Sequence, residues 1–247
     1  MSKITKPTLV LLPGYDGDGV VTFAKLTQLL SKHVNCLVIN YPYFGQRDKS
    51  YSSSELISYV HEITIQRKLH HFHLAGFSMG GFIASSYAMR YPQQIGSLTL
   101  ISSSVQPQLS AINTCLIQSA YYLFKIPLFV QIFSKIYCSP ALSNFVSKLP
   151  IPPLQGSFSA DLAYPIFGTL SNVLHSSLNA RLTQQLAQST IPKQAILFAD
   201  DRSFPATVYA PILKKLGFIV TVNQYGGHAT GHNYWPQVIN TLDRLFE

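Results

Sequence analysis

The stretch Leu74-Ala75-Gly76-Phe77-Ser78-Met79-Gly80-Gly81 decides the fold of this chain. It is an apolar segment that breaks into a Gly-x-Ser-x-Gly turn. Upstream, His71–Ala75 alternates as a strand does, and downstream Phe82–Met89 has the small residues of a helix that packs closely on a sheet. Such a turn exposes its serine at the edge of a sheet, so the residues two places before and after it need to be almost free of side chain. We therefore predict that Ser78 is a nucleophile, placed where a strand passes into a helix.

The composition indicates a folded protein with a large apolar interior. Hydrophobic residues make up 47% of the 247 residues and charged residues only 11%, a balance that excludes a disordered chain. Lys and Arg outnumber Asp and Glu by 18 to 10, which gives a net charge of +8. This charge favours an acidic partner or an anionic membrane surface. No run of Lys and Arg supports a nucleic-acid partner.

The cysteines and the amino terminus indicate where the protein works. Cys36, Cys115 and Cys138 are odd in number and lack Cys-x-x-Cys spacing, so the sequence predicts neither a disulfide framework nor a zinc site. The apolar run Leu9–Leu12 is too short for a secretory signal and ends in Pro13-Gly14. We therefore expect a cytoplasmic protein.

Strand and helix patterns alternate through the first hundred residues. Short apolar runs at Thr8–Leu12, Cys36–Asn40 and Leu98–Ile101 are typical of strands buried in a parallel sheet. Between them, Val21–His33 has the pattern of an amphipathic helix. A further helix begins after Ser52, with Glu55 placed to complete a capping box. This order predicts an α/β protein with a mostly parallel sheet and helices on both of its faces.

The alternation stops from Val105 to Thr190. Helical periodicity continues there without convincing strands and with several prolines, the last of which is Pro165, so we expect an inserted helical cap over 105–190. Strand patterns return at Ala195–Phe198 and Phe218–Val222, and Trp235–Phe246 is the last predicted helix. The expected core domain is therefore 1–104 together with 191–247.

Two features of the sequence invite comparison with cofactor and metal sites, and neither has the full pattern. The glycine-rich loop Pro13–Gly19 follows a strand, but its spacing is Gly-x-x-Gly-x-Gly rather than the dinucleotide-binding Gly-x-Gly-x-x-Gly, and no acidic residue follows about 20 positions later. His71 and His73 share one face of a strand without a carboxylate to support a metal. We expect no cofactor and no metal.

A serine nucleophile needs a base, usually a histidine that is held by a carboxylate. In a parallel sheet these partners emerge at the carboxyl ends of the strands. Among the few acidic residues, only Asp200 and Asp201 directly follow a late strand, and His228 and His232 follow the last one. The residues by themselves leave both pairs open.

Several motifs together resemble the α/β-hydrolase superfamily. They are Gly76–Gly81 followed by Tyr91-Pro92, Leu11–Tyr15 at the first strand end, Asp201-Arg202-Ser203-Phe204-Pro205 and Gly226-Gly227-His228-Ala229. The order Ser, Asp, His is also the order of that superfamily. The resemblance is strongest to its esterase-like branch, which includes carboxylesterases, haloperoxidase-type enzymes and the pimeloyl-carrier-protein methyl esterase. It implies the α/β-hydrolase fold.

The resemblance also implies roles for individual residues. It selects Asp201 over Asp200 and His228 over His232, so the implied triad is Ser78, His228 and Asp201. Such a triad cleaves acyl esters or thioesters through an acyl-enzyme. Acyl transfer, C–C bond hydrolysis and a binding protein without turnover are alternatives on the same fold.

The stabilisation of a developing oxyanion is assigned by position in the same way. The donors implied are the backbone N–H groups of Tyr15 and Met79. The chain departs from the superfamily at two places near the site. Pro13 stands where His is usual, and Phe198 stands where Gly is usual.

The expected cap contains an aromatic and nearly uncharged stretch, Tyr121–Phe133, that is more apolar than a single buried helix face requires. Its second face has three possible uses: lining an acyl pocket, contacting a membrane, or packing inside the cap. Lys125 and Lys135 would suit an acidic partner such as an acyl carrier protein. The expected substrate is a small-molecule or carrier-bound acyl ester.

Overall fold

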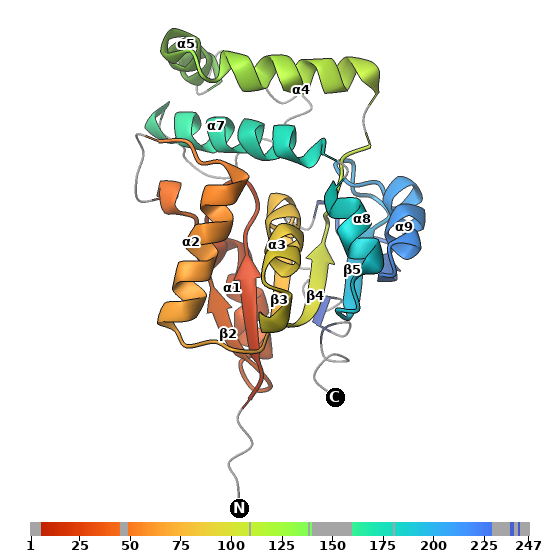
Figure 1. Ribbon diagram of the computed structural model, residues 1–247. Coiled ribbons are helices and arrows are strands. Elements are labelled where there is room, and N and C mark those ends of the chain that lie inside the picture. The colour runs from red at the N-terminus through yellow and green to blue at the C-terminus, as the bar shows by residue number, and fades with distance from the viewer. Residues whose placement is uncertain are drawn as a thin grey trace, which may run out of the picture.

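The structure is a computed structural model (Figure 1), and it describes residues 6–44, 49–108, 110–137, 139, 160–179, 181–228, 238, 239 and 242. Its centre is one six-stranded sheet in the order β2-β1-β3-β4-β5-β6, in which every pair of neighbours is parallel. The strands are β1 (Thr8–Leu12), β2 (Asn35–Val38), β3 (Phe72–Phe77), β4 (Ile95–Ile101), β5 (Lys193–Phe198) and β6 (Ile219–Asn223).

Helices cover both faces of the sheet, because successive side chains of each buried strand point to opposite faces. On one face, Val10 and Leu12 of β1 belong to a core that includes α2 (Ser53–Gln66), α3 (Met79–Arg90), α8 (Arg181–Gln188) and α9 (Ala206–Lys215). On the other face, Leu9 and Leu11 pack with α1 (Gly19–Leu30). Both cores reach 0% exposure at the centre of the sheet, which confirms the expected α/β architecture.

The local helix signals of the sequence also hold. The Ser52 side chain accepts a hydrogen bond from the Glu55 backbone N–H, and the Glu55 carboxylate accepts one from the Ser52 backbone N–H, so the capping box of α2 is confirmed. Of the predicted helix Trp235–Phe246, the structure describes Val238, Ile239 and Leu242, which are helical. Val238 and Leu242 are buried in the same core as α1.

One strand differs from its prediction. The sequence predicts Cys36–Asn40 as a strand buried on both faces, whereas β2 spans Asn35–Val38 and is only half-buried. The reason is its position, because among the described strands β2 pairs with β1 alone and lies at an edge of the sheet. Apolar composition cannot distinguish an edge strand from a central one.

Helices above the carboxyl edge of the sheet form the cap (Figure 1). They are α7 (Ala160–Ser177) and, outside it, α4 (Ala111–Leu123) and α5 (Pro127–Tyr137). Pro127 begins α5, as proline at a first helical position does. Proline usually interrupts a helix, and the prolines of this segment suggest breaks between its helices, but α7 continues through Pro165. α8 falls within the numbering of the expected cap but buries Leu182 and Leu186 in the core that contains α3.

The cap is tied to the core and packed by aromatic rings. The Thr169 hydroxyl of α7 accepts a hydrogen bond from the Tyr51 backbone N–H at 2.9 Å, and the Asn172 side chain donates to the Tyr51 carbonyl at 3.1 Å. The phenylalanine rings of the predicted aromatic stretch pack inside the cap, whereas Tyr122 is exposed. Phe124 and Phe133 contact each other and Phe167 of α7, with ring centroids 5.0 to 6.3 Å apart. Across the described residues, we find no helix with the length and apolar character needed to span a bilayer.

Candidate active site

Ser78 lies in a strained turn between β3 and α3. Its backbone has φ 52° and ψ −122°, a region that residues other than glycine rarely adopt. A Cβ on Gly76 would collide with the backbone of Gly80, and a Cβ on Gly80 would collide with the carbonyls of Leu12 and Pro13. Both glycines are therefore required by close backbone approach, and they let the turn hold the serine hydroxyl at the sheet edge.

Ser103 supports this turn from the neighbouring strand end. It follows β4, is fully buried, and its hydroxyl donates a hydrogen bond to the Ser78 carbonyl at 2.5 Å. A Cβ on Gly81 would collide with the Ser103 side chain. The strained backbone of Ser78 is thus held by a second serine that the sequence analysis did not single out.

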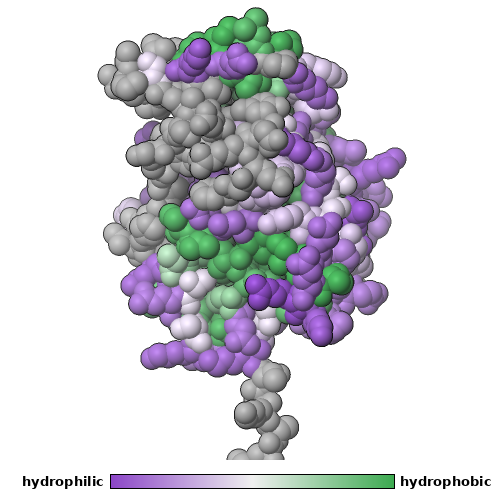
Figure 2. Space-filling model, turned by 90° about the vertical axis from the view of Figure 1, so that its left-hand side faces the viewer, coloured by the Kyte–Doolittle hydropathy of each residue, from purple (hydrophilic) through white to green (hydrophobic). Residues whose placement is uncertain are grey.

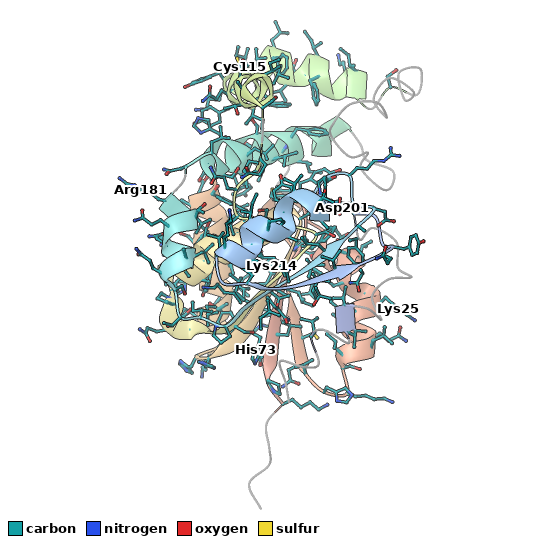
Figure 3. The ribbon with its side chains drawn as sticks, turned by 90° about the vertical axis from the view of Figure 1, so that its right-hand side faces the viewer. Lys25, His73, Cys115, Arg181, Asp201 and Lys214 are labelled. Atoms are coloured by element: carbon teal, nitrogen blue, oxygen red, sulfur yellow. The ribbon has the colours of Figure 1, made fainter. Side chains whose placement is uncertain are left out.

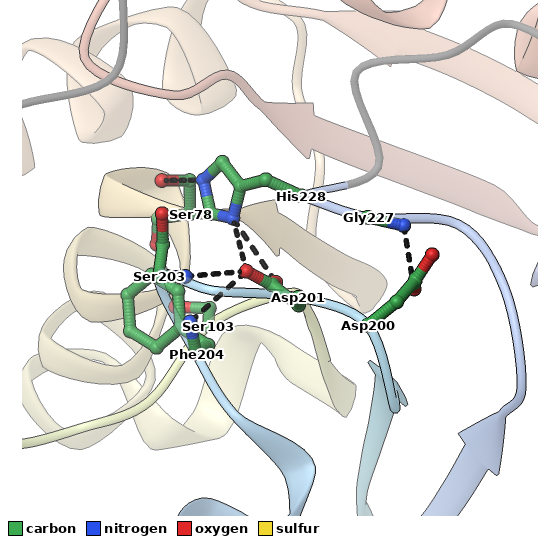
Figure 4. A network of polar contacts seen from close by, with 8 residues as sticks. All are labelled: Ser78, Ser103, Asp200, Asp201, Ser203, Phe204, Gly227 and His228. Carbon is green, nitrogen blue, oxygen red and sulfur yellow. Dashed lines mark hydrogen bonds and ion pairs between the residues drawn. The ribbon is translucent and has the colours of Figure 1, made fainter. Parts of the chain in front are cut away.

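The structure brings Ser78, His228 and Asp201 together (Figure 4). His228 Nε2 lies 2.9 Å from Ser78 Oγ, although the two residues are 150 positions apart. His228 Nδ1 lies 3.0 Å from Asp201 Oδ2 and 3.2 Å from Asp201 Oδ1. A neutral imidazole with its proton on Nδ1 satisfies both partners, since it donates to the carboxylate and accepts from the serine hydroxyl.

Asp201 is fixed by its own loop. It leaves the end of β5, its side chain is buried, and Oδ1 accepts hydrogen bonds from the backbone N–H groups of Ser203 at 2.8 Å and Phe204 at 3.0 Å. Those two bonds fix the orientation of the carboxylate, which faces His228. Figure 3 shows Asp201 at the edge of the sheet beneath the cap, whereas His73 lies near the opposite edge.

The Asp200 carboxylate has a different task from that of Asp201. It turns to the histidine loop, where it accepts hydrogen bonds from the backbone N–H of Gly227 at 2.8 Å and of Gly226 at 3.3 Å. Gly227 has a φ of 54° and directly precedes His228. Neighbouring acids at one strand end thus hold one histidine in two ways, Asp201 through the ring and Asp200 through the backbone.

Aromatic rings enclose His228 on two sides. The Phe204 ring is stacked with the imidazole at a centroid distance of 5.6 Å and an interplanar angle of 13°, and the Phe77 ring lies 5.2 Å away at 43°. These rings restrict the orientation of the imidazole and reduce its contact with water. Phe77 precedes Ser78 and Phe204 follows Asp201, so the loops that carry these two residues both contribute a ring.

The loop after β1 reaches the same edge. Leu12 is paired with Gly76, so Pro13 to Tyr15 emerge beside the nucleophile turn. The Tyr43 hydroxyl, from the short 3-10 helix η1 (Pro42–Phe44), donates a hydrogen bond to the Tyr15 carbonyl at 2.7 Å. This bond supports a loop in which Pro13 replaces the usual histidine.

Comparisons with known proteins agree with this fold. A family model described as the alpha/beta hydrolase fold matches residues 7–127. An esterase from Exiguobacterium antarcticum superposes with a TM-score of 0.68 at 17% identity, over 98% of this chain and 92% of the esterase. This chain has the α/β-hydrolase fold.

Curated relatives match shorter segments of this α/β-hydrolase-fold protein. A pimeloyl-[acyl-carrier protein] methyl ester esterase from Aeromonas salmonicida is 32% identical over 101 residues, which are 40% of this chain and 38% of the relative. A putative 2-succinyl-6-hydroxy-2,4-cyclohexadiene-1-carboxylate synthase from Bacillus subtilis is 45% identical over 56 residues, 23% of this chain and 20% of the relative. The aligned segments therefore span less than two thirds of either relative.

Asp16 is an unusual carboxyl group beside the first loop of the hydrolase fold. It is largely buried, and one of its side-chain oxygens has no hydrogen-bond partner among the described residues. Burial, together with the nearby Asp18, raises its pKa to about 6. Its neighbour Tyr41 is 1% exposed and also has a hydroxyl without a partner in the described structure. Burial raises the pKa of Tyr41 as well.

Other residues that the sequence weighed lie elsewhere. His73 Nδ1 lies 2.8 Å from Ser97 Oγ, inside the sheet and away from the triad. His232 falls outside the described residues. Within the described ranges, no three His, Cys, Asp or Glu side chains gather in a way that would hold a metal ion.

Sequence reasoning missed the supporting residues of the site. Ser103, Tyr43, Phe77 and Phe204 act through contacts between distant segments, and no local pattern marks them. The sequence does mark Asp200 as one of two candidate acids. It does not indicate that both acids would hold the same histidine.

Proposed function

We propose that this protein is a serine hydrolase that cleaves carboxylic esters or thioesters through an acyl-enzyme. The observation that carries the proposal is the continuous hydrogen-bonded series from Ser78 Oγ through the His228 ring to the Asp201 carboxylate. The nucleophile is strained and nearly buried, at 7% exposure. A serine, a histidine and a carboxylate with these separations perform acyl transfer on several unrelated folds.

The first half of the reaction forms the acyl-enzyme. Ser78 Oγ attacks the acyl carbon while its proton passes to His228 Nε2, and the carbonyl oxygen becomes an oxyanion. The backbone N–H groups of Met79 and Tyr15 are the proposed donors to that oxygen. The tetrahedral intermediate then collapses, the bond to the leaving oxygen or sulfur breaks, and the proton on Nε2 passes to the leaving group.

The second half releases the acid. A water molecule gives a proton to His228 Nε2 and its oxygen attacks the acyl carbon, so a second tetrahedral intermediate forms. The bond to Ser78 Oγ then breaks, and the proton returns from Nε2 to the serine. Asp201 remains ionised and stabilises the imidazolium that forms twice in each cycle.

The comparisons support an acyl ester as the substrate class. The relative from Aeromonas is named as an esterase of a carrier-bound methyl ester, and the superposed protein from Exiguobacterium is an esterase. We accordingly propose a small-molecule or carrier-bound acyl ester as the substrate. The alternatives on this triad are acyl transfer to an alcohol and hydrolysis of a C–C bond, and analysis of the products distinguishes them from ester hydrolysis.

Covalent labelling tests the proposal directly. Wild-type protein treated with a fluorophosphonate should gain one adduct, located on Ser78 by peptide mass spectrometry, and Ser78→Ala should gain none. Ser86→Ala changes a serine of the same helix, about two turns beyond Ser78, and is the matched control that should label as the wild type does. Folded wild-type protein without an adduct would leave a ligand-binding protein as the remaining reading of the fold.

A further inference from the structure

The outer layer of the cap carries an exposed apolar face. Eight of the sixteen large hydrophobic side chains that are exposed among the described residues lie between 112 and 136. We call these eight the outer cap face. They are Ile112, Leu116, Tyr122, Leu123 and Ile126 on and after α4, and Leu128, Ile132 and Ile136 on α5. Their exposures run from 39% to 74%, and Figure 2 shows hydrophobic residues gathered at this end of the molecule.

This face is a second apolar surface of these helices and not their packing surface. Ile112, Leu116 and Leu123 repeat at helical spacing on α4, as Leu128, Ile132 and Ile136 do on α5. The packing surface of α5 is separate from them. Val130 is 5% exposed, and the rings of Phe129 and Phe133 pack against Phe124 and α7. The cap therefore has its own core, and the outer face is left over.

The charge around this face has one sign. No Asp or Glu occurs between Glu62 and Asp161, so α4 and α5 contain no acidic residue. Lys125 and Lys135 are both exposed on this layer. Lys125 Nζ lies 4.0 Å from the centroid of the Tyr121 ring and donates to the Tyr121 hydroxyl at 2.8 Å. The net charge of the whole chain, which includes these two lysines, is +8.

We propose that the outer cap face docks onto the surface of an anionic lipid bilayer. Ile and Leu side chains that project from two adjacent short helices suit insertion at the level of the lipid headgroups, and lysines beside them suit anionic lipids. The face lies on the outermost layer of the cap, with α7 between it and the sheet (Figure 1). No other described element shields it.

An acidic carrier protein and a second copy of this chain fit the face less well. Recognition of an acidic protein draws on a dense set of basic side chains, whereas this layer offers two lysines among eight apolar residues. A second copy would bring four lysines into one interface without an acidic residue from α4 or α5 to pair with them, because a twofold interface uses the same patch on both chains.

Vesicle flotation with the full chain tests the proposal. Wild-type protein should float with vesicles of phosphatidylcholine and phosphatidylglycerol at a 7:3 ratio, and more weakly with phosphatidylcholine alone. Leu128→Gln with Ile132→Gln should lower partitioning onto both kinds of vesicle about tenfold or more. Lys125→Gln and Lys135→Gln should each lower partitioning about fivefold on anionic vesicles only.

The controls are exposed residues of the same kinds outside the cap. Val208→Gln with Ile219→Gln, and Lys214→Gln, should partition as the wild type does. An unchanged melting temperature in every variant shows that the cap remains folded. Equal loss in the cap variants and the controls would overturn the proposal, and so would the absence of flotation. A dimer in analytical ultracentrifugation, or tight binding to an acyl carrier protein, that the Leu128 and Ile132 changes abolish without any effect on vesicles would also overturn it.

Discussion

The Asp200 carboxylate accepts a hydrogen bond from the backbone N–H of Gly227 at 2.8 Å, one residue before His228. The same carboxylate accepts a second bond from Gly226, while Asp201 contacts the ring of the histidine. Asp200 therefore fixes the backbone of the loop that carries His228, and Asp201 fixes the orientation of its ring. A histidine on a loop with two glycines needs both, because glycine leaves the backbone free to move.

Asp200 is expected to be a positioning residue. Asp200→Ala should lower kcat about tenfold with little change in KM, because the imidazole would occupy the productive position less often. Asp200→Asn retains one acceptor oxygen and should lose less than threefold. Steady-state kinetics on an activated short-chain ester measures both, and equal activity of Asp200→Ala and wild type would contradict the role.

Variants of the proposed triad should lose much more activity than variants of Asp200. Ser78→Ala, His228→Ala and Asp201→Asn are each expected to lower kcat about 10³-fold or more, because the nucleophile, the base or its correct tautomer is removed. Ser78→Ala should leave the melting temperature nearly unchanged, since its hydroxyl contributes little to packing. His232→Ala is the control from the other candidate histidine and should retain most activity. A reversed order of the two histidine variants would transfer the role of base to His232.

The loop after β1 offers a pair of matched tyrosine variants. Tyr43→Phe removes the hydrogen bond to the Tyr15 carbonyl, and we expect kcat to fall about tenfold because the proposed oxyanion donor loses its support. The lost buried hydrogen bond should also lower the free energy of unfolding by about 1 kcal/mol. Tyr41→Phe removes a hydroxyl for which the described residues provide no partner, so it should change neither quantity adversely. Equal loss in both variants would mean that general packing, and not the bond to Tyr15, is responsible.

Asp16 should make stability depend on pH. Its pKa is about 6 in the folded protein and 3.8 in its ordinary state, so the folded protein binds more protons than the unfolded chain between these values. The free energy of unfolding attributable to Asp16 therefore falls as the pH rises from about 4 to 6. Asp16→Asn should be more stable than wild type by about 2 kcal/mol at pH 7.5 and by much less at pH 4. Urea unfolding at several pH values decides this, and parallel curves for both proteins would refute it.

Phe198 stands at the position where the α/β-hydrolase superfamily usually has glycine. Its ring packs directly against Gly226. A Cβ on Gly226 would collide with the fully buried ring of Phe198. Gly226→Ala should therefore lower both the melting temperature and kcat, because it displaces the loop that precedes His228. Adding Phe198→Leu should restore part of both. If the double variant were worse than the sum of the single changes, this pair would not be the cause.

Features that depend on residues close together along the chain could be predicted from the sequence. Three such features are the Gly-x-Ser-x-Gly turn at Ser78, the capping box at Ser52 and Glu55, and the strand and helix patterns themselves. Each is a local pattern, because it is set by the spacing of residues within one element or one turn. They predicted an α/β protein with a mostly parallel sheet, and the resemblance of its motifs implied the α/β-hydrolase fold. The same resemblance implied Ser78, Asp201 and His228 as a triad, whereas the residues alone left Asp200 and His232 as alternatives.

The tertiary structure decided what depends on segments that are distant along the chain. The half-exposed state of β2 follows from its place at the sheet edge, and the tasks of Asp200 and Asp201 follow from which of them faces the imidazole ring. Tyr43 supports the Tyr15 loop from 28 positions away, a relation that no spacing rule contains. Both faces of the apolar cap stretch Tyr121–Phe133 are apolar in sequence, so its composition could not show which face would be buried. Only the packing of Phe124 and Phe133 against α7 determined which side was buried and which was left exposed.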